Sequence, residues 1–153
     1  MSDNELVKEF EEKVIALDRV ARVVRGGRRF RFRAVVVVGN GKGLVGLGVG
    51  KGADVMSSIA KAVAKAKNSL VEISLKNTTI PYEIEVRYSG AKVLLKPASE
   101  GTGVIAGGAV RNVVEAAGIK DLLSKSFGSN NKVNNAYATL AALTQLKLRE
   151  QKK

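Results

Sequence analysis

The sequence predicts an α+β protein built from two small units that pack on one another. Runs rich in Val, Ile and Phe at 14–24 and 28–38 have the composition of strands, and a helical repeat of apolar residues follows over 53–70. The segment 77–81, Asn-Thr-Thr-Ile-Pro, interrupts the pattern and marks a boundary. Each unit has only roughly 75 residues, too few for a generous core of its own, so we expect a shared one.

The first unit is predicted to begin with a short amphipathic helix over 2–12. The two strand runs join through Gly26 and Gly27, a hairpin signal because two glycines accept the positive φ of a tight turn. Arginines alternate with apolar residues on the second strand, so the apolar face should be buried and the arginine face exposed. The arginine positions are Arg29, Arg31 and Arg33, and the apolar ones are Phe30, Phe32 and Ala34.

A third strand is predicted over 44–49, which gives the first unit the order β-β-β-α. Glycine at every second position over 46–52 indicates a strand whose backbone another surface approaches closely. The helix over 53–70 is expected to bury one stripe at helical spacing. That stripe comprises Val55, Met56, Ile59, Val63, Ala66 and Leu70.

The second unit is predicted to contain strands over 83–88 and 92–96 and a glycine-rich stretch over 101–108. That stretch leads into a helix ending before Gly118, and a short strand within 119–127 and a last helix over 133–148 follow. The three tyrosines, Tyr82, Tyr88 and Tyr137, are scattered and predict no base-stacking platform. The predicted organisation is therefore a tail or helix over 1–12, domains over 13–76 and 82–148, and a polar tail over 149–153.

The composition favours binding over catalysis. Among 153 residues there are 26 Lys and Arg against 14 Asp and Glu, a net charge of +12, and neither Cys nor His. These absences exclude disulfides, thiolate chemistry and Ser-His-Asp triads. No apolar run approaches the roughly 20 residues of a membrane span, and the acidic start has none of the features of a signal peptide. We therefore expect a soluble, cytoplasmic protein.

Positive charge is concentrated in the first unit. Residues 19–76 carry 13 basic and 2 acidic side chains, and 19–33 carry seven arginines and no acid. Such one-signed charge indicates an anionic partner. Nucleic acid is the leading candidate, because the basic amphipathic helix that a membrane surface would favour is missing. The alternative is an ordinary solvated hairpin.

The hairpin chemistry suits phosphate. Guanidinium groups donate paired hydrogen bonds to phosphate oxygens, and a glycine tip lets backbone N–H groups come close. No Asn or Gln lies on the hairpin to read base edges, so we expect recognition of the shape of folded or double-stranded RNA. The candidate RNA-binding residues are Arg19, Arg22, Arg25, Gly26, Gly27, Arg28, Arg29, Arg31, Arg33, Lys42 and Lys51.

A second reading is enzymatic. Gly101, Gly103 and Ala106 follow a predicted strand and precede a helix, with Asp121 twenty positions after the first glycine, which is the spacing of a dinucleotide-binding fingerprint. Only about fifty residues follow Gly101, and they show no second βαβ run of buried parallel strands. Backbone packing or an RNA or protein contact is the favoured explanation of this stretch.

Several segments resemble the bacterial small-subunit ribosomal protein five family. They are 22–30 (Arg-Val-Val-Arg-Gly-Gly-Arg-Arg-Phe), 39–43, 46–51, 79–81 and, most specifically, 96–111 (Lys-Pro-Ala-Ser-Glu-Gly-Thr-Gly-Val-Ile-Ala-Gly-Gly-Ala-Val-Arg). The resemblance runs from about 12 to about 146 and implies a first unit like a double-stranded-RNA-binding domain, packed against a β-α-β-α lobe. Tyr137 departs from the family pattern, where Arg is common.

The resemblance also implies a function. Members of the family bind 16S ribosomal RNA near the neck between head and body of the small subunit, with the hairpin reaching toward that neck. With small-subunit proteins three and four they line the messenger-RNA entrance tunnel, and they contact protein eight through the second unit. Gly103 and Arg111 are the candidate contacts with protein four, an interface that bears on decoding accuracy. No cofactor, metal or small-molecule substrate is implied. A free-standing RNA chaperone is the alternative.

Overall fold

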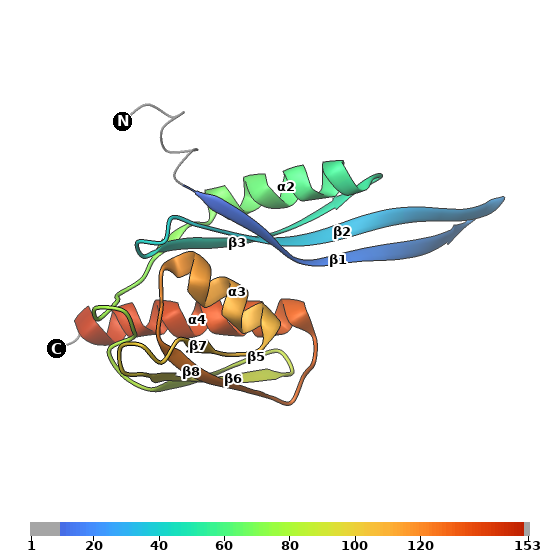
Figure 1. Ribbon diagram of the computed structural model, residues 1–153. Coiled ribbons are helices and arrows are strands. Elements are labelled where there is room, and N and C mark those ends of the chain that lie inside the picture. Colours follow the sequence, from blue (N-terminus) through green and yellow to red (C-terminus); the bar gives the residue numbers. More distant parts are fainter. Residues whose placement is uncertain (1–9, 152–153) are drawn as a thin grey trace, which may run out of the picture.

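The computed structural model of the chain describes residues 10–151, without the side chains of Arg22, Val24, Arg28, Arg29 and 147–151. Two four-stranded sheets are stacked with helices in alternating layers (Figure 1). Helix α2 covers the outer face of the first sheet, and α3 and α4 lie between the two sheets. This is the predicted α+β class, with a β-β-β-α unit followed by a β-α-β-α lobe.

The first sheet is antiparallel with strand order β1-β2-β3-β4. Its strands are β1 (Glu11–Val24), β2 (Gly27–Gly39), β3 (Leu44–Gly52) and β4 (Val71–Glu72). The helix predicted over 2–12 is wrong over its last three residues, because Phe10 has no regular structure and Glu11 and Glu12 pair with Gly39 and Val38 in the ladder. The rest of that prediction, up to residue 9, lies outside the described residues.

Helix α2 (Val55–Asn68) begins at Asp54, whose side chain accepts a hydrogen bond from the Ser57 N–H at 2.7 Å. Its backbone lies directly on the glycines of β3, so the predicted close approach is confirmed. The buried residues of the helix are Ser58, Ala62 and Ala66, one turn apart. The predicted stripe is wrong at Met56, which is 76% exposed, because the closest face of the helix is the one with small side chains.

The second sheet has the order β5-β6-β8-β7, with β7 parallel to β8. Its elements are β5 (Ile84–Tyr88), β6 (Ala91–Pro97), β7 (Val104–Ile105), α3 (Gly108–Ala117), β8 (Leu122–Phe127) and α4 (Lys132–Gln151). Helix α3 ends where expected, at Gly118 with a left-handed φ of 98°. Helix α4 continues through 149–151, which were expected to be a polar tail.

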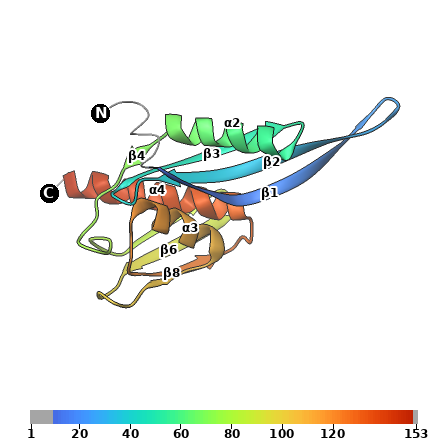
Figure 2. The same cartoon turned by 45° about the horizontal axis from the view of Figure 1, so that its top comes forward.

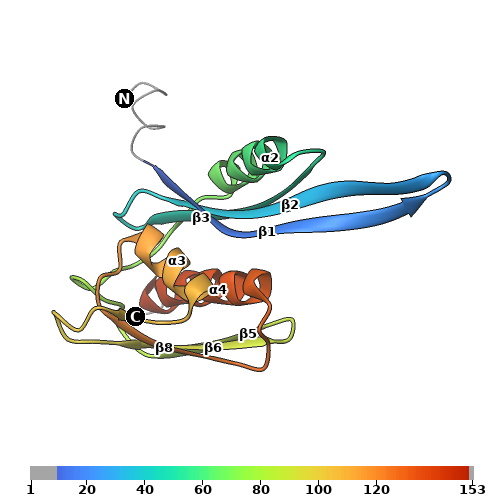
Figure 3. The ribbon, with the colours of Figure 1, turned by 45° about the vertical axis from the view of Figure 1, so that its right-hand side comes forward.

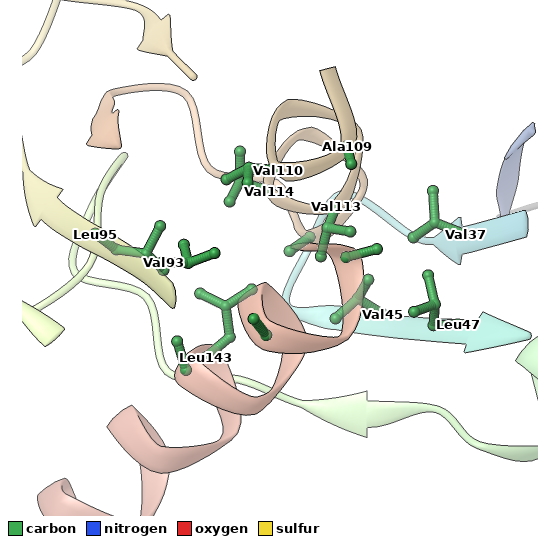
Figure 4. Close-up of a cluster of buried hydrophobic side chains, with 14 of the residues drawn as sticks. Val37, Val45, Leu47, Val93, Leu95, Ala109, Val110, Val113, Val114 and Leu143 are labelled. Carbon is green, nitrogen blue, oxygen red and sulfur yellow. The ribbon is translucent and has the colours of Figure 1, made fainter. Parts of the chain in front are cut away.

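One hydrophobic core joins the two units, as expected from their size. In Figure 4 the first sheet contributes Val37, Val45 and Leu47, the second contributes Val93 and Leu95, and Val113 of α3 and Leu143 of α4 lie among them. Both faces of the inner part of β2 are therefore covered. Val35 and Val37 enter the shared core, whereas Ala34, Val36 and Val38 pack against α2. Toward its turn, however, the β1–β2 hairpin extends beyond α2 on one side and beyond the second unit on the other (Figures 2 and 3).

Candidate nucleic-acid interface

The projecting part of the β1–β2 hairpin, residues 19–33, is named here the arginine hairpin. Its turn is formed by Arg25 and Gly26, and Val24 pairs with Gly27 across it. Gly26 and Gly27 have φ values of 98° and 151°, which other residues rarely adopt. A Cβ at either position would meet nothing within 4 Å. The backbone conformation, and not internal packing, therefore requires glycine at this exposed tip.

The described arginines of the hairpin fall into two environments. Arg25 and Arg31 are exposed, and the Arg19 guanidinium carbon lies 3.7 Å from the centroid of the Phe30 ring, in cation–π contact. Arg33 lies deeper and donates a hydrogen bond to the Asp18 carboxylate at 2.7 Å. The side chains of Arg22, Arg28 and Arg29 lie outside the description, although their backbones pair in the ladder. Arg25, in the turn, is therefore exposed to solvent, whereas Arg33, nearer the body of the fold, is held in place by Asp18.

Lys51 extends the charged surface onto β3. It pairs directly with Arg33, and Arg31, Arg33 and Lys51 lie on the face of the sheet that continues into the shared core. These three residues are named the basic sheet face. Lys42 is exposed in the β2–β3 loop, at the other end of β2 from the hairpin tip. Because β2 has 13 residues, the two ends lie roughly 40 Å apart, so Lys42 is not part of the same patch.

The face of β2 that was expected to be buried is covered only in part: Ala34 is buried and Phe32 half-buried, but Phe30 and two valines of β1 are exposed. Phe30 is 42% exposed, Val20 46% and Val23 79%. Alternation along β2 does place Ala34 in the core beneath α2, but the helix ends its coverage before the outer half of the strand. The sequence pattern revealed the alternation and gave no signal of where the covering layer stops. The hairpin therefore exposes both guanidinium groups and apolar side chains to solvent.

The dinucleotide-like spacing around Gly101 has an internal explanation. Asp121 is 3% exposed, and its Oδ1 accepts hydrogen bonds from the N–H groups of Gly103 at 2.8 Å and Gly101 at 3.1 Å. The hydrogen bond from the Thr78 side chain, and then those from the glycine turn, hold the pKa of Asp121 below its usual range. Helix α3 begins only at Gly108, after β7. The carboxylate thus fixes its own glycine turn and does not face a ribose.

The two predicted protein-contact residues occupy different positions on the second unit. Gly103 has a φ of 81° in the turn before β7, and Arg111 lies in the first turn of α3. Arg111 Nε donates to Glu115 Oε1 at 2.9 Å, and Lys13 of β1 reaches Glu115 Oε2 at 3.1 Å. These contacts, the one with Arg111 foremost, lower the pKa of Glu115. Glu115 therefore links the two units at the surface.

Two further features are absent among the described residues of 10–151: a membrane-spanning helix and a group of metal-ligating side chains. No helix in this part of the chain is both long and apolar enough to cross a membrane. Nor do the described residues bring together three or more carboxylate, imidazole or thiolate groups that could hold a metal ion.

Comparison with known proteins identifies the family. The description "Ribosomal protein S5, N-terminal domain" matches residues 10–74, and "Ribosomal protein S5, C-terminal domain" matches residues 86–153. The chain belongs to the ribosomal protein S5 family. It is 57% identical over 140 residues to the small ribosomal subunit protein uS5 of Campylobacter jejuni strain 81-176, covering 92% of this chain and 95% of the relative. The same values hold for uS5 of strains 81116 and RM1221. The S5 family consists of structural ribosomal proteins and not of enzymes, which excludes the enzymatic reading of the glycine turn.

Proposed function

We propose that this chain is a structural component of the small ribosomal subunit in the cytoplasm and binds 16S ribosomal RNA, near the neck between head and body, through the arginine hairpin. The observation that carries the proposal is the hairpin itself. It projects beyond every layer of the fold, and its exposed side chains include Arg25 and Arg31. A projecting basic strand pair reaches into RNA structure that the compact body cannot enter, and relatives more than half identical are small-subunit proteins.

The contacts proposed are with phosphates. The exposed guanidinium groups can each donate two hydrogen bonds to one phosphate, and the Phe30 ring holds Arg19 in a defined orientation. Lys51 and Arg31 continue the positive surface along the sheet. The hairpin has no amide side chain, so the RNA is recognised by its backbone shape. Lys42, at the far end of β2, contacts a different part of the RNA.

The proposed protein contacts lie on the second unit. We assign Gly103 and Arg111 to the contact with small-subunit protein four, with protein eight also on this unit and protein three nearby at the messenger-RNA entrance tunnel. The Arg111 side chain is 57% exposed, and Glu115 is held by Lys13 as well. Arg111 can therefore exchange Glu115 for a carboxylate of a partner without leaving Glu115 unpaired. An interface of exchangeable ion pairs can open and close, which is how it would influence decoding accuracy.

The salt dependence of RNA binding tests the hairpin. Replacing Arg25, Arg28 and Arg29 together by Ala should lower the slope of log affinity against log salt by about 2–3 units if each contacts a phosphate. Replacing the exposed Lys96, Lys120 and Lys125 removes the same charge from the second unit and is the matched control. If the control lowers the slope and the hairpin variant leaves it unchanged, the RNA surface lies on the second unit and the assignment of the hairpin is wrong.

A free-standing RNA chaperone would have the same binding physics but a different location. Sedimentation of native lysate through a sucrose gradient at roughly 0.5 M salt separates the two, because affinity based on phosphate contacts alone falls by orders of magnitude. A ribosomal component should remain in the small-subunit peak, held by RNA and neighbouring proteins together. Release of the chain to the top of the gradient would favour the chaperone.

A further inference from the structure

We propose that Tyr88 and Tyr137 form a stacking platform for one unpaired RNA base, a second RNA contact separate from the arginine hairpin. This inference rests on the proposed RNA-binding function. The two rings, which the sequence led us to treat as scattered, are stacked with centroids 5.4 Å apart and planes inclined by 21°. Tyr88 is the last residue of β5 and Tyr137 lies in the second turn of α4, so only the tertiary fold brings them together.

The two rings differ in exposure. Ile84 and Val86, at alternate positions before Tyr88, are buried beneath the helices, whereas Tyr88 lies at the end of the strand and is 42% exposed. Tyr137 is half-buried, and burial raises the pKa of its hydroxyl above the usual range. The pair therefore has an inner ring fixed by the fold and an outer ring open to solvent. A base can stack on such a pair with little loss of side-chain entropy.

The two elements that carry the rings also carry unpaired cations. Lys132, at the start of α4, and Arg87, which alternation places on the other face of the edge strand β5 from Tyr88, are exposed and form no ion pair among the described residues. The Glu85 carboxylate on the same strand is paired with Lys92 at 3.1 Å. The free cations can bind the phosphates on either side of a stacked base.

The position of the platform relates it to the hairpin. The β5–β6 turn and the start of α4 lie at the end of the second unit toward which the hairpin projects, and Figures 1 and 3 both show them beneath it. The basic sheet face is on the side of the sheet that faces the second unit. An RNA whose phosphates lie against Arg31 and Lys51 therefore has the platform beside it, where a duplex end or bulge could place an unpaired base.

A purely structural stack, which only attaches β5 to α4, makes a different prediction. Tyr88→Leu keeps a smaller apolar side chain against Tyr137 but removes the aromatic face, and Tyr88→Phe keeps the face and removes the hydroxyl. A structural role predicts that both variants bind RNA like the original chain. A platform predicts that Tyr88→Phe preserves base-dependent binding and Tyr88→Leu abolishes it.

The experiment uses the full chain and three RNA probes. Each contains the same duplex of about 16 base pairs. One is blunt, one has a single-stranded overhang of about four adenosines, and one has an overhang of the same length with abasic sugars. The abasic probe keeps every phosphate, so the ratio of affinities for the two overhangs reports base stacking alone. We expect the original chain and Tyr88→Phe to prefer the adenosine overhang by roughly five- to a hundredfold. Tyr88→Leu should bind both overhangs equally.

The blunt duplex separates the possible failures. The three proteins should bind it with the same affinity and the same salt slope, which shows that the variants are folded and the hairpin intact. If the original chain binds the adenosine and abasic overhangs equally, or Tyr88→Leu retains the preference, the platform is wrong and the proposed function stands. If the original chain binds none of the three probes, both the platform and the proposed RNA-binding function are wrong.

Discussion

The two glycine-rich segments of the chain use glycine for opposite reasons. In β3, the glycines at 46, 48 and 50 have ordinary extended backbone, but a Cβ on any of them would overlap the backbone of α2. In the turn at 101–103, Gly101 and Gly103 have φ values of 94° and 81°, and a Cβ there would meet nothing within 4 Å. Glycine is required by a neighbour in the first segment and by the backbone dihedral in the second. Only the second segment leaves its surface open to a partner.

The comparison predicts the largest loss of stability at Gly48. A Cβ there would overlap the Ala62 carbonyl oxygen and lie 2.5 Å from the Ala66 backbone nitrogen, and backbone atoms cannot move aside as a flexible side chain can. Gly48→Ala should therefore lower the free energy of unfolding by about 3 kcal/mol or more, because α2 must be displaced from the sheet. Urea denaturation of the variant and the original chain measures the difference.

Gly108→Ala is the matched control for that substitution. Gly108 is the first residue of α3 and has open space around its Cβ position. The same added methyl group should leave stability unchanged or raise it by about 0.4–1 kcal/mol, because Ala favours the helix and restricts the unfolded chain. Equal losses at Gly48 and Gly108 would show that contact with α2 is not what makes the β3 glycines necessary.

The next largest loss of stability is expected at Gly103, where an added Cβ would strain the backbone but would not overlap a neighbouring atom. An L-residue in the left-handed region is disfavoured by about 1–2 kcal/mol, so Gly103→Ala should lower the free energy of unfolding by that amount. Gly103→Asn should recover part of the loss, since Asn tolerates this region better. A loss as large as that at Gly48, with no recovery by Asn, would contradict a purely conformational requirement.

These segments also show what the sequence can predict. The alternating glycines of β3 indicated a close approach, because a strand without Cβ atoms has few other uses. The sequence could not say that the approaching surface is the face of α2 bearing Ser58 and Ala62, since that depends on how deeply the helix sits. The sequence also showed that Gly101 and Asp121 have the spacing of a dinucleotide-binding fingerprint. Only the fold showed that Asp121 turns back to bind the same glycines.

The candidate site was predictable to a similar degree. The arginines and the turn of the hairpin follow from local sequence, and the strands over 14–24 and 28–38 are present. The exposure of Val23 does not follow from local sequence, because it depends on where the covering layers end. The stacking of Tyr88 on Tyr137 does not either, because it depends on the contact between β5 and α4. Local alternation and composition predict elements, whereas exposure and long-range pairing depend on how those elements pack.

A smaller effect on stability, seen only at acid pH, is expected at Asp121, whose carboxylate accepts hydrogen bonds from Gly101 and Gly103. The pKa of Asp121 is lowered in the folded chain, chiefly by Thr78 and the Gly103 N–H, so its stabilisation is present above the unfolded pKa and is lost as pH falls through the folded one. Unfolding at pH values below the ordinary carboxyl range should therefore be easier, and Asp121→Asn should make stability less dependent on pH there. Denaturation midpoints measured from pH 7 down to about 2 test this. If the midpoints of the variant and of the original chain fall equally as the pH is lowered, the Asp121 carboxylate does not stabilise the turn.

The smallest effect is expected at Glu115, beside the open surface of α3. Its carboxylate binds Arg111 within the helix and Lys13 across the two units, and all three side chains are partly exposed. Solvent-exposed ion pairs contribute about 0.2–1 kcal/mol, so Glu115→Gln should lower the free energy of unfolding within that range and less at high salt. A double-mutant cycle with Lys13→Met should give a coupling energy of the same small size, because that pair alone joins β1 to α3 through charge among the described residues. A coupling of several kcal/mol would mean that the surface around Arg111 is a rigid joint, and an exchangeable contact with a partner there would be untenable.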